Sequence, residues 1–182
     1  MSGFTKKAII ACFGEMLKTT PFDKITVSAL VAKCEISSNT FYYHFKDIYD
    51  LLETWMRYTL SPFVQDMSLQ WKEQVKKLLF YMKDNPKTVY HIMNSMSRES
   101  LEKHVFLQSD DVFDRMITER IGDLHVSDED RKYIAEFLRY AFMGFFLRFI
   151  WGHMQGDIDK DVDRLARMFE ALVDSLITEA QE

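Results

Sequence analysis

Residues 37–46 read Ser-Ser-Asn-Thr-Phe-Tyr-Tyr-His-Phe-Lys, and this stretch decides how the first third of the chain is interpreted. Phe41 and Phe45 are four residues apart, which places both on one face of a short helix. The positions around them hold hydroxyls, an amide, phenol rings, an imidazole and an ammonium, which suit contacts to phosphates and base edges. The sequence therefore predicts a short helix with one aromatic face that packs in the core and one polar face that is exposed. This arrangement is typical of a recognition helix that enters a DNA groove.

The residues upstream predict the first half of a helix-turn-helix. Three helices are expected before Asp47, over residues 5–20, 27–33 and 38–45. Thr26 and Ser37 are suited to cap the second and third, because a side-chain hydroxyl accepts hydrogen bonds from free amides at a helix start. A tight turn over residues 34–36 joins these two helices, and Asp47 caps the helix that follows.

Helical periodicity continues through the rest of the chain, and no segment shows the alternation typical of a strand. Further helices are predicted over residues 69–84, 86–96, 98–122, 128–154 and 160–180. Pro86 stands at a first helical position, and Gly152 and Gly156 end the most apolar helix. We therefore expect an all-α protein with about nine helices in total. A three-helix domain would occupy residues 1–46 and a larger helical body residues 47–182, with the helix after Asp47 as connector.

The charge distribution fits a DNA contact at one end of the chain. The net charge is −5 over 182 residues. Residues 1–46 hold six lysines against three acidic residues, a net charge of +3, which leaves −8 for residues 47–182. A basic head on an acidic body is compatible with a protein that touches nucleic acid through its head alone.

Cysteine usage and hydropathy favour a reduced, cytoplasmic protein. Cys12 and Cys34 both lie within apolar helical patterns, which predicts two core thiols rather than a disulfide or metal pair. The longest apolar block, residues 137–151, contains two arginines and is shorter than the about 20 apolar residues that span a bilayer. The N-terminus lacks the pattern of a signal peptide, so a cytoplasmic location without membrane association is expected.

Catalytic and metal-binding patterns find little support. The acidic run over residues 157–163 is similar to a calcium loop, but Val162 stands at the glycine position and Met168 at the glutamate position. The five histidines show no ligand spacing. No phosphate-binding glycine loop or nucleophile elbow occurs. We therefore expect no enzymatic activity, no cofactor and no metal.

Residues 25–52, ITVSALVAKCEISSNTFYYHFKDIYDLL, resemble the TetR family of bacterial transcriptional regulators. The most specific part is residues 40–45, and the resemblance covers about residues 5–60. In the penultimate helix, the pattern Tyr140-x-x-x-Gly144 with Trp151 is similar to a C-terminal subgroup that includes regulators of dihydroxyacetone kinase operons.

The resemblance implies a homodimer that offers the helix over residues 38–45 of each subunit to a major groove. It also implies an all-helical regulatory body, whose last two helices pack against those of the partner subunit. In many members this body binds a small molecule, which changes the distance between the two DNA-binding domains. The chain departs from the family pattern at Glu35, where glycine is usual, and at Ile48, where lysine is frequent. A left-handed backbone at Glu35 would be strained, and Ile48 removes a phosphate contact.

The candidate DNA-binding residues are Thr26, Ser37, Ser38, Asn39, Thr40, Tyr42, Tyr43, His44 and Lys46. Asn39 can pair with an adenine edge, and Lys46 can neutralise a phosphate. Thr26 is expected to be both helix cap and phosphate ligand, because helix N-termini attract anions. Lys6 and Lys7 are further candidate phosphate contacts.

The body offers two further sets of candidates. Apolar and aromatic side chains that could line a ligand cavity, or simply form core, are Tyr81, Tyr90, His91, Met93, Phe106, Phe113, Met116, Phe137 and Tyr140. The penultimate helix is apolar nearly all round, so we expect it to meet its own core on one side and a second subunit on another. The predicted dimer contacts are Phe142, Gly144, Phe145, Phe149, Leu165, Phe169, Leu172 and Leu176.

The resulting hypothesis is a homodimeric repressor that a small-molecule effector releases from a palindromic operator in double-stranded DNA. One alternative is an activator that works with a protein coactivator, which an exposed apolar patch away from the dimer face would favour. Another is a helical interaction module without DNA binding.

Overall fold

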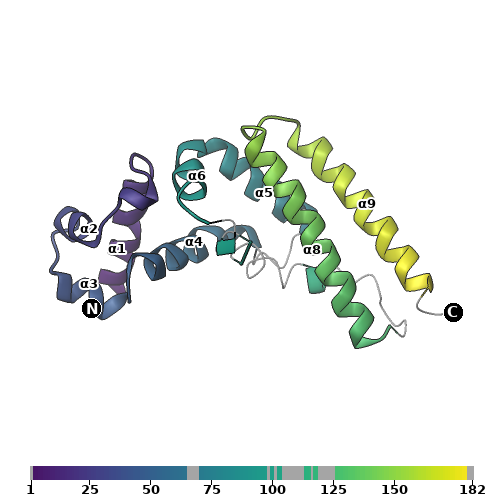
Figure 1. Cartoon of the computed structure of the whole chain (residues 1–182), viewed down its shortest axis with the longest axis horizontal. Coiled ribbons are helices and arrows are strands. Elements are labelled where there is room, and N and C mark those ends of the chain that lie inside the picture. The colour runs from purple at the N-terminus through teal and green to yellow at the C-terminus, as the bar shows by residue number, and fades with distance from the viewer. Residues whose placement is uncertain are drawn as a thin grey trace. The chain divides into compact units, whose positions relative to one another are not determined.

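The computed structural model describes residues 2–64, 70–97, 99–100, 102–103, 113–115, 117–118 and 126–179, and every regular element in these ranges is a helix (Figure 1). The helices are α1 Ser2–Leu17, η1 Phe22–Lys24 (a 3-10 turn), α2 Val27–Lys33, α3 Ser38–His44, α4 Ile48–Val64, α5 Trp71–Asp84, α6 Pro86–Met93, α8 Asp128–Trp151 and α9 Ile158–Glu179. The predicted all-α class is confirmed. Most of the helix predicted over residues 98–122 lies outside the described residues.

The chain forms two compact units. Unit 1 contains Met1–Pro62 and Asn85–Ser97, and unit 2 contains Phe63–Asp84 and Arg98–Glu182. This division does not coincide with the boundary expected at residue 46, because α4 and α6 contribute to the core of unit 1. Leu51 and Leu52 of α4 and Ile92 of α6 belong to the same apolar cluster as the side chains of α1 and α3.

Aromatic side chains hold α3 against α1 and α4 in unit 1. Phe41 and Phe45 are 0% and 2% exposed, so the predicted apolar face of α3 is the buried one. Phe13 of α1 meets Phe22 and Trp55 edge to face, with centroid distances of 6.3 Å for both pairs. Edge-to-face aromatic pairs add stability beyond the area they bury, which favours a fixed packing of α1 against η1 and α4, around the buried Phe41 and Phe45.

The helix α4 continues through Pro62, a residue type that usually interrupts a helix. A proline inside a helix has no N–H and leaves the carbonyl four residues earlier without its usual donor. That carbonyl belongs to Tyr58, and the Ser61 hydroxyl donates to it at 3.3 Å. The serine therefore replaces the hydrogen bond that the proline removes.

Gly14 of α1 allows Trp55 of α4 to pack closely, which predicts the effect of a substitution. A Cβ at residue 14 would lie 2.6 Å from Trp55 Nε1, which is too close for a nonbonded contact. Alanine normally stabilises a helix interior relative to glycine, but here the clash reverses the sign, and Gly14→Ala should destabilise unit 1 by about 1–3 kcal/mol. Urea unfolding measures this, and Gly3→Ala is the control because nothing lies within 4 Å of its added Cβ.

His91 of α6 closes the C-terminal end of α1. Its Nδ1 lies 2.7 Å from the carbonyl oxygen of Leu17, the last residue of α1, so the imidazole N–H donates to a carbonyl that has no partner within the helix. Ser95, which follows α6, donates its hydroxyl to Asp23 Oδ1 at 3.2 Å. Two side-chain hydrogen bonds thus reinforce the apolar packing of α6 in unit 1.

In unit 2, α9 packs on α5 and α8, and this packing buries part of the predicted dimer interface. Phe142, Phe149 and Phe169 are only 5%, 9% and 4% exposed within the single chain. Phe113 contacts the rings of Phe142 and Phe169 at centroid distances of 5.6 and 6.2 Å. These phenylalanines, Phe142 and Phe149 of α8 and Phe169 of α9, are therefore buried within the single chain, and their part in a subunit interface stays a prediction.

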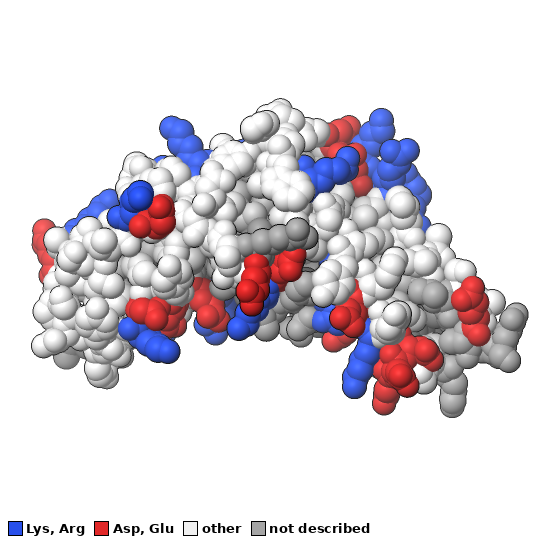
Figure 2. Space-filling model, viewed as in Figure 1, with Lys and Arg blue, Asp and Glu red and all other residues white. Residues whose placement is uncertain are grey.

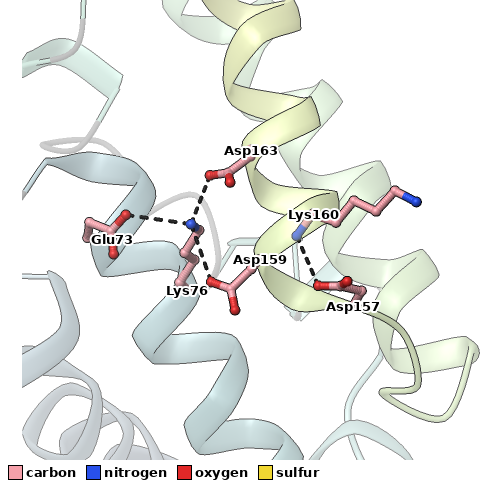
Figure 3. A network of polar contacts seen from close by, with 6 residues as sticks. All are labelled: Glu73, Lys76, Asp157, Asp159, Lys160 and Asp163. Atoms are coloured by element: carbon pink, nitrogen blue, oxygen red, sulfur yellow. Dashed lines mark hydrogen bonds and ion pairs between the residues drawn. The ribbon is translucent and has the colours of Figure 1, made fainter.

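A lysine among three carboxylates connects α5 to α9 (Figure 3). Lys76 Nζ lies 2.8 Å from Asp163 Oδ1, 3.3 Å from Asp159 Oδ1 and 3.6 Å from Glu73 Oε1. The Lys76 side chain is only 12% exposed. Its hydrogen bonds to Asp163 and Asp159 raise the pKa of Lys76, and the hydrogen bond from Lys76 lowers the pKa of Asp163. The contact fixes the register of the two helices.

The acidic run before and within α9 has structural partners. Asp157 Oδ1 accepts a hydrogen bond from the Lys160 backbone amide at 3.1 Å at the start of α9, and Asp159 and Asp163 contact Lys76. Among the residues that the structure describes, no group of three or more histidine, cysteine or acidic side chains could hold a metal ion. None of the described helices is long and apolar enough to cross a membrane.

Both cysteines are free thiols packed against the core of unit 1, as predicted. Burial raises the pKa of the Cys34 thiol to about 12, and the neighbouring Cys12 thiol contributes to the shift. Thiols with so high a pKa are poor nucleophiles near neutral pH, which agrees with a packing role.

Candidate DNA-binding surface

The helix pair α2 and α3 forms a helix-turn-helix with both predicted caps in place. The Thr26 hydroxyl accepts from the Ala29 amide at 3.2 Å, and the Ser37 hydroxyl accepts from the Thr40 amide at 3.1 Å. Both cap residues have extended backbone, as N-cap residues do. The caps fix where α2 and α3 begin, and therefore which side chains of α3 point outward.

The outward face of α3 carries the predicted contact residues. Tyr42 and Tyr43 are 59% and 76% exposed, and Ser38 and Asn39 are exposed as well. The Thr40 hydroxyl lies 2.9 Å from the Ser37 hydroxyl, and the His44 ring meets Tyr43 edge to face at 4.9 Å. An exposed tyrosine pair is unusual for a surface without a partner, since large aromatic side chains are normally buried. This face combines ring surface, hydroxyls and an amide, which suits base edges and phosphates.

Figure 2 shows that the end of unit 1 that holds α2 and α3 is mostly uncharged on the face in view, with acidic and basic side chains interspersed beyond it. The net charge of the first 46 residues is therefore not gathered into one basic patch on this face. On this face, the side chains near α2 and α3 are therefore mostly neutral.

Glu35 adopts a left-handed backbone conformation at the position where the family usually has glycine. Its φ is +55°, in the region that glycine adopts without strain. It follows Cys34, the C-cap of α2, and the Ile36 amide bonds the Val31 carbonyl at 3.0 Å. The turn thus keeps the geometry usual for a helix end but places a side chain where glycine fits better.

Replacing Glu35 by glycine should stabilise unit 1. Relief of the left-handed strain is worth about 1–2 kcal/mol, and the extra freedom of glycine in the unfolded chain offsets about half of it. We expect a net gain of about 0.5–1 kcal/mol in the free energy of unfolding, measured by urea denaturation. Glu35→Ala is the control, because it removes the carboxylate but keeps the strain. Equal stabilisation by both variants would show that charge, not backbone conformation, is responsible.

Carboxylates occupy the N-terminal end of α4, next to the exposed Lys46. Asp47 Oδ1 accepts from the amides of Tyr49 and Asp50, both at 2.9 Å, and Asp50 Oδ2 accepts from the Lys46 amide at 2.8 Å. The predicted cap at Asp47 is confirmed. A phosphate that approached this helix end would find these amides already bonded to anionic groups.

The predicted pocket residues are divided between the two units. Those in unit 1 are Tyr90, His91 and Met93, and those described in unit 2 are Tyr81, Phe113, Phe137 and Tyr140. Phe106 and Met116 lie outside the described residues. Phe113 is buried, whereas Phe137 and Tyr140 are 53% and 57% exposed. Their role in a ligand site stays a prediction.

Sequence reasoning missed an exposed aromatic face on α8. Tyr133, Phe137, Tyr140 and Trp151 are 76%, 53%, 57% and 70% exposed, and Gly144 lies between them with open space around its Cα. Positions 133, 137, 140, 144 and 151 recur at helical spacing, so they form one stripe on the outside of α8. That spacing was present in the sequence, but the apolar residues on the other sides of the helix obscured it. The side chain of Leu176, another predicted dimer contact, lies outside the described residues.

Comparison with known proteins agrees with this geometry. The family description "Bacterial regulatory proteins, tetR family" matches residues 15–54, and "Transcriptional regulator C-terminal region" matches residues 70–171. The HTH-type dhaKLM operon transcriptional activator DhaS of Lactococcus lactis subsp. lactis (strain IL1403) is 23% identical over 137 residues, which is 73% of this chain and 72% of that protein.

Two solved structures share the fold. The dihydroxyacetone kinase operon activator DhaS superimposes with a TM-score of 0.70 at 21% identity, covering 93% of this chain and 96% of the other. A TetR transcriptional regulator from Streptococcus agalactiae 2603V gives a TM-score of 0.58 at 18% identity, covering 94% of each chain. These relatives are transcriptional regulators rather than enzymes. Because one family match alone spans more than half of the residues, the chain belongs to the TetR family of bacterial transcriptional regulators.

Proposed function

We propose that two copies of this DNA-binding regulator bind one twofold-symmetric operator, each with α3 in a major groove. The observation that carries the proposal is the polar and tyrosine-rich face of α3, which is exposed while Phe41 and Phe45 hold the helix from behind. A seven-residue helix is about 10 Å long, which fits a major groove about 12 Å wide. The two half-sites would lie about one helical turn of DNA apart, or a multiple of it.

The proposed roles of the side chains follow from their positions. Asn39 reads a base edge, and Thr40 and Ser38 reach bases or phosphates. Tyr42, Tyr43 and His44 supply ring contacts and phosphate hydrogen bonds, and Lys46 neutralises a phosphate. Thr26 and Ser37 present phosphate-binding hydroxyls at the starts of α2 and α3, in addition to their capping role.

Two substitutions on this surface separate specificity from affinity. Asn39→Ala should cost about 1–3 kcal/mol on the preferred operator and relax the preference at one base pair per half-site. Lys46→Ala should weaken binding to DNA of any sequence by the same factor, because a phosphate contact carries no sequence information. It should also lower the salt dependence of binding. Selection from a random duplex library, followed by binding titrations at several salt concentrations, measures both effects. Wild-type binding by both variants would contradict this assignment of contacts.

The exposed stripe on α8 is the face that we assign to the subunit interface. Tyr133, Phe137, Tyr140 and Trp151 span about 27 Å of helix, and Gly144 near the middle permits close approach of a second helix. Leu165 and Leu172 of α9 and Phe145 of α8 are partly buried in the protomer and would extend the same interface. A row of exposed aromatic side chains along one helix is characteristic of an interaction site.

The sign of regulation has two candidates. Repression released by a small-molecule effector is the outcome expected from the sequence and from the family. Activation is favoured by one observation, the similarity to proteins described as DhaS, an operon activator, in both sequence and fold. An activator of this kind would respond to a protein coactivator instead of, or together with, a small molecule.

One experiment tests the proposed function and another its sign. Wild-type protein should enrich a palindromic motif from a random duplex library, and its affinity should fall steeply with salt. Binding to random and enriched duplexes with equal affinity would contradict operator recognition. A reporter driven by a promoter that contains the motif should fall in expression with the regulator if it represses, and rise if it activates.

A further inference from the structure

We propose that Lys6 of α1 supplies the phosphate contact at the C-terminal end of α3 that the N-terminal end of α4 does not provide. The inference rests on the proposed DNA binding and identifies a further positioning element of that surface. It begins from the side chain of Lys6, whose Nζ lies 5.2 Å from the centroid of the Phe45 ring.

The ring of Phe45 places the Lys6 ammonium at a defined point of the DNA-binding surface. Phe45 is the C-cap of α3 and is 2% exposed, so its position is fixed by the core. The face of an aromatic ring attracts a cation without a hydrogen bond, so the three N–H donors of the ammonium remain available to a phosphate. Figure 1 shows the N-terminal end of α1 beside α3, in agreement with this contact.

No carboxylate of the described residues forms an ion pair with Lys6. The ion pairs of Lys18, Lys24 and Lys76, for example, do not include it. A lysine that is held in place but not paired can release counterions from DNA when it meets a phosphate. Because the side chain is already ordered against the ring, it loses less conformational freedom on binding than a fully solvated lysine.

The N-terminal end of α4, by contrast, carries two carboxylates, which repel an anion. The amides of Tyr49 and Asp50 are hydrogen bonded to the Asp47 carboxylate, and the amide of Lys46, just before the helix, is hydrogen bonded to the Asp50 carboxylate. Ile48, at the position where the family often has lysine, is partly buried against the core of unit 1. Two negative side chains and one apolar side chain therefore stand where a phosphate contact is expected. Two cations beside Phe45 can supply the missing phosphate contact. Lys46 follows Phe45 in the sequence, and Lys6 of α1 lies over its ring.

Lys7 provides a matched control within the same helix. It has the same charge and is adjacent in sequence, but it is exposed and has no aromatic ring beneath its ammonium among the described contacts. If general positive charge of α1 were enough, Lys6 and Lys7 would contribute equally. The proposal requires that they differ.

The test measures the salt dependence of binding to double-stranded DNA enriched from a random library by the full-length wild-type protein. Each phosphate contact contributes about 0.9 to the slope of log K against log salt concentration, so Lys6→Gln should lower the slope by about 1.8 for a dimer. Lys7→Gln should change it by less than half as much. Lys6→Arg, which keeps charge and ring contact, should retain the wild-type slope.

The outcomes distinguish this inference from the proposed function. Wild-type protein that enriches no duplex overturns both. If the wild type binds the operator but Lys6→Gln and Lys7→Gln show equal salt dependence of binding, only the role of Lys6 is overturned and the proposed function stands. If Lys6→Gln lowered the urea midpoint but left the salt dependence of DNA binding unchanged, Lys6 would have a packing role, and the proposed phosphate contact would be overturned. If Lys6→Gln unfolds in urea as the wild type does but shows the reduced salt dependence of DNA binding, the role of Lys6 is supported.

Discussion

Replacing Phe41 by alanine is expected to unfold the DNA-binding part of unit 1 while unit 2 keeps its structure. Phe41 is 0% exposed and contacts the rings of Phe45 and Tyr42 at 5.7 and 5.2 Å. Truncation of a buried phenylalanine costs about 3–5 kcal/mol, because the cavity left behind collapses only in part. That loss is a large share of the about 5–15 kcal/mol by which a typical domain is stable.

Hydrogen exchange with peptide resolution would show where the stability is lost. Amides of α2 and α3 should lose protection in Phe41→Ala, whereas those of α9 should exchange as in wild type, since local openings follow cooperative units. Tyr43→Ala is the matched control on the same helix, because Tyr43 is 76% exposed and its truncation should cost only about 0.5 kcal/mol. Both variants should lose operator binding, but only Phe41→Ala should lose protection. Full protection of α3 in Phe41→Ala would mean that the helix is held by something other than its aromatic face.

The contrast between Phe41 and Tyr43 explains why the buried and exposed faces of α3 could be predicted from the sequence. Phe41 and Phe45 recur at helical spacing among polar residues, so their spacing alone assigns one face of α3 to the core. Thr26 and Ser37 marked the helix starts, because capping is a local interaction between residues three apart. Local signals of this kind survive in the sequence, and the structure confirms both caps and the buried face.

The body was less predictable, because its determining contacts are not local. The helix α8 is apolar on most sides, so periodicity could not tell which side meets its own unit and which is exposed. The structure places Phe142 and Phe149 inside and Tyr133 and Trp151 outside. The residues predicted to line a ligand cavity are divided between the two units, and composition alone does not report that α6 packs in unit 1 and α8 in unit 2.

The same exposed stripe leads to a second large effect, because Tyr140→Arg should separate the subunits of the proposed dimer. Tyr140 is 57% exposed in the protomer, so an arginine there leaves the fold intact. It lies one turn from Gly144, where a twofold axis would bring two copies of α8 together, so the substitution would place two like charges in a desolvated interface. Linked half-site binding raises affinity by about 10²–10⁴-fold, and the variant should lose operator affinity by at least about 100-fold.

Sedimentation of Tyr140→Arg, together with operator titration, tests whether the loss of affinity comes from dissociation. Tyr58→Arg is a closely matched control, since Tyr58 is also a tyrosine that is 57% exposed, but it lies on α4, outside the stripe. The control should remain dimeric, whereas Tyr140→Arg should sediment as a monomer with unchanged helix content. Because α3 is untouched, the monomer should keep weak, salt-dependent binding to a single half-site, as expected when a second recognition helix is lost. A dimeric Tyr140→Arg that binds the operator as wild type does would move the subunit interface away from this face of α8.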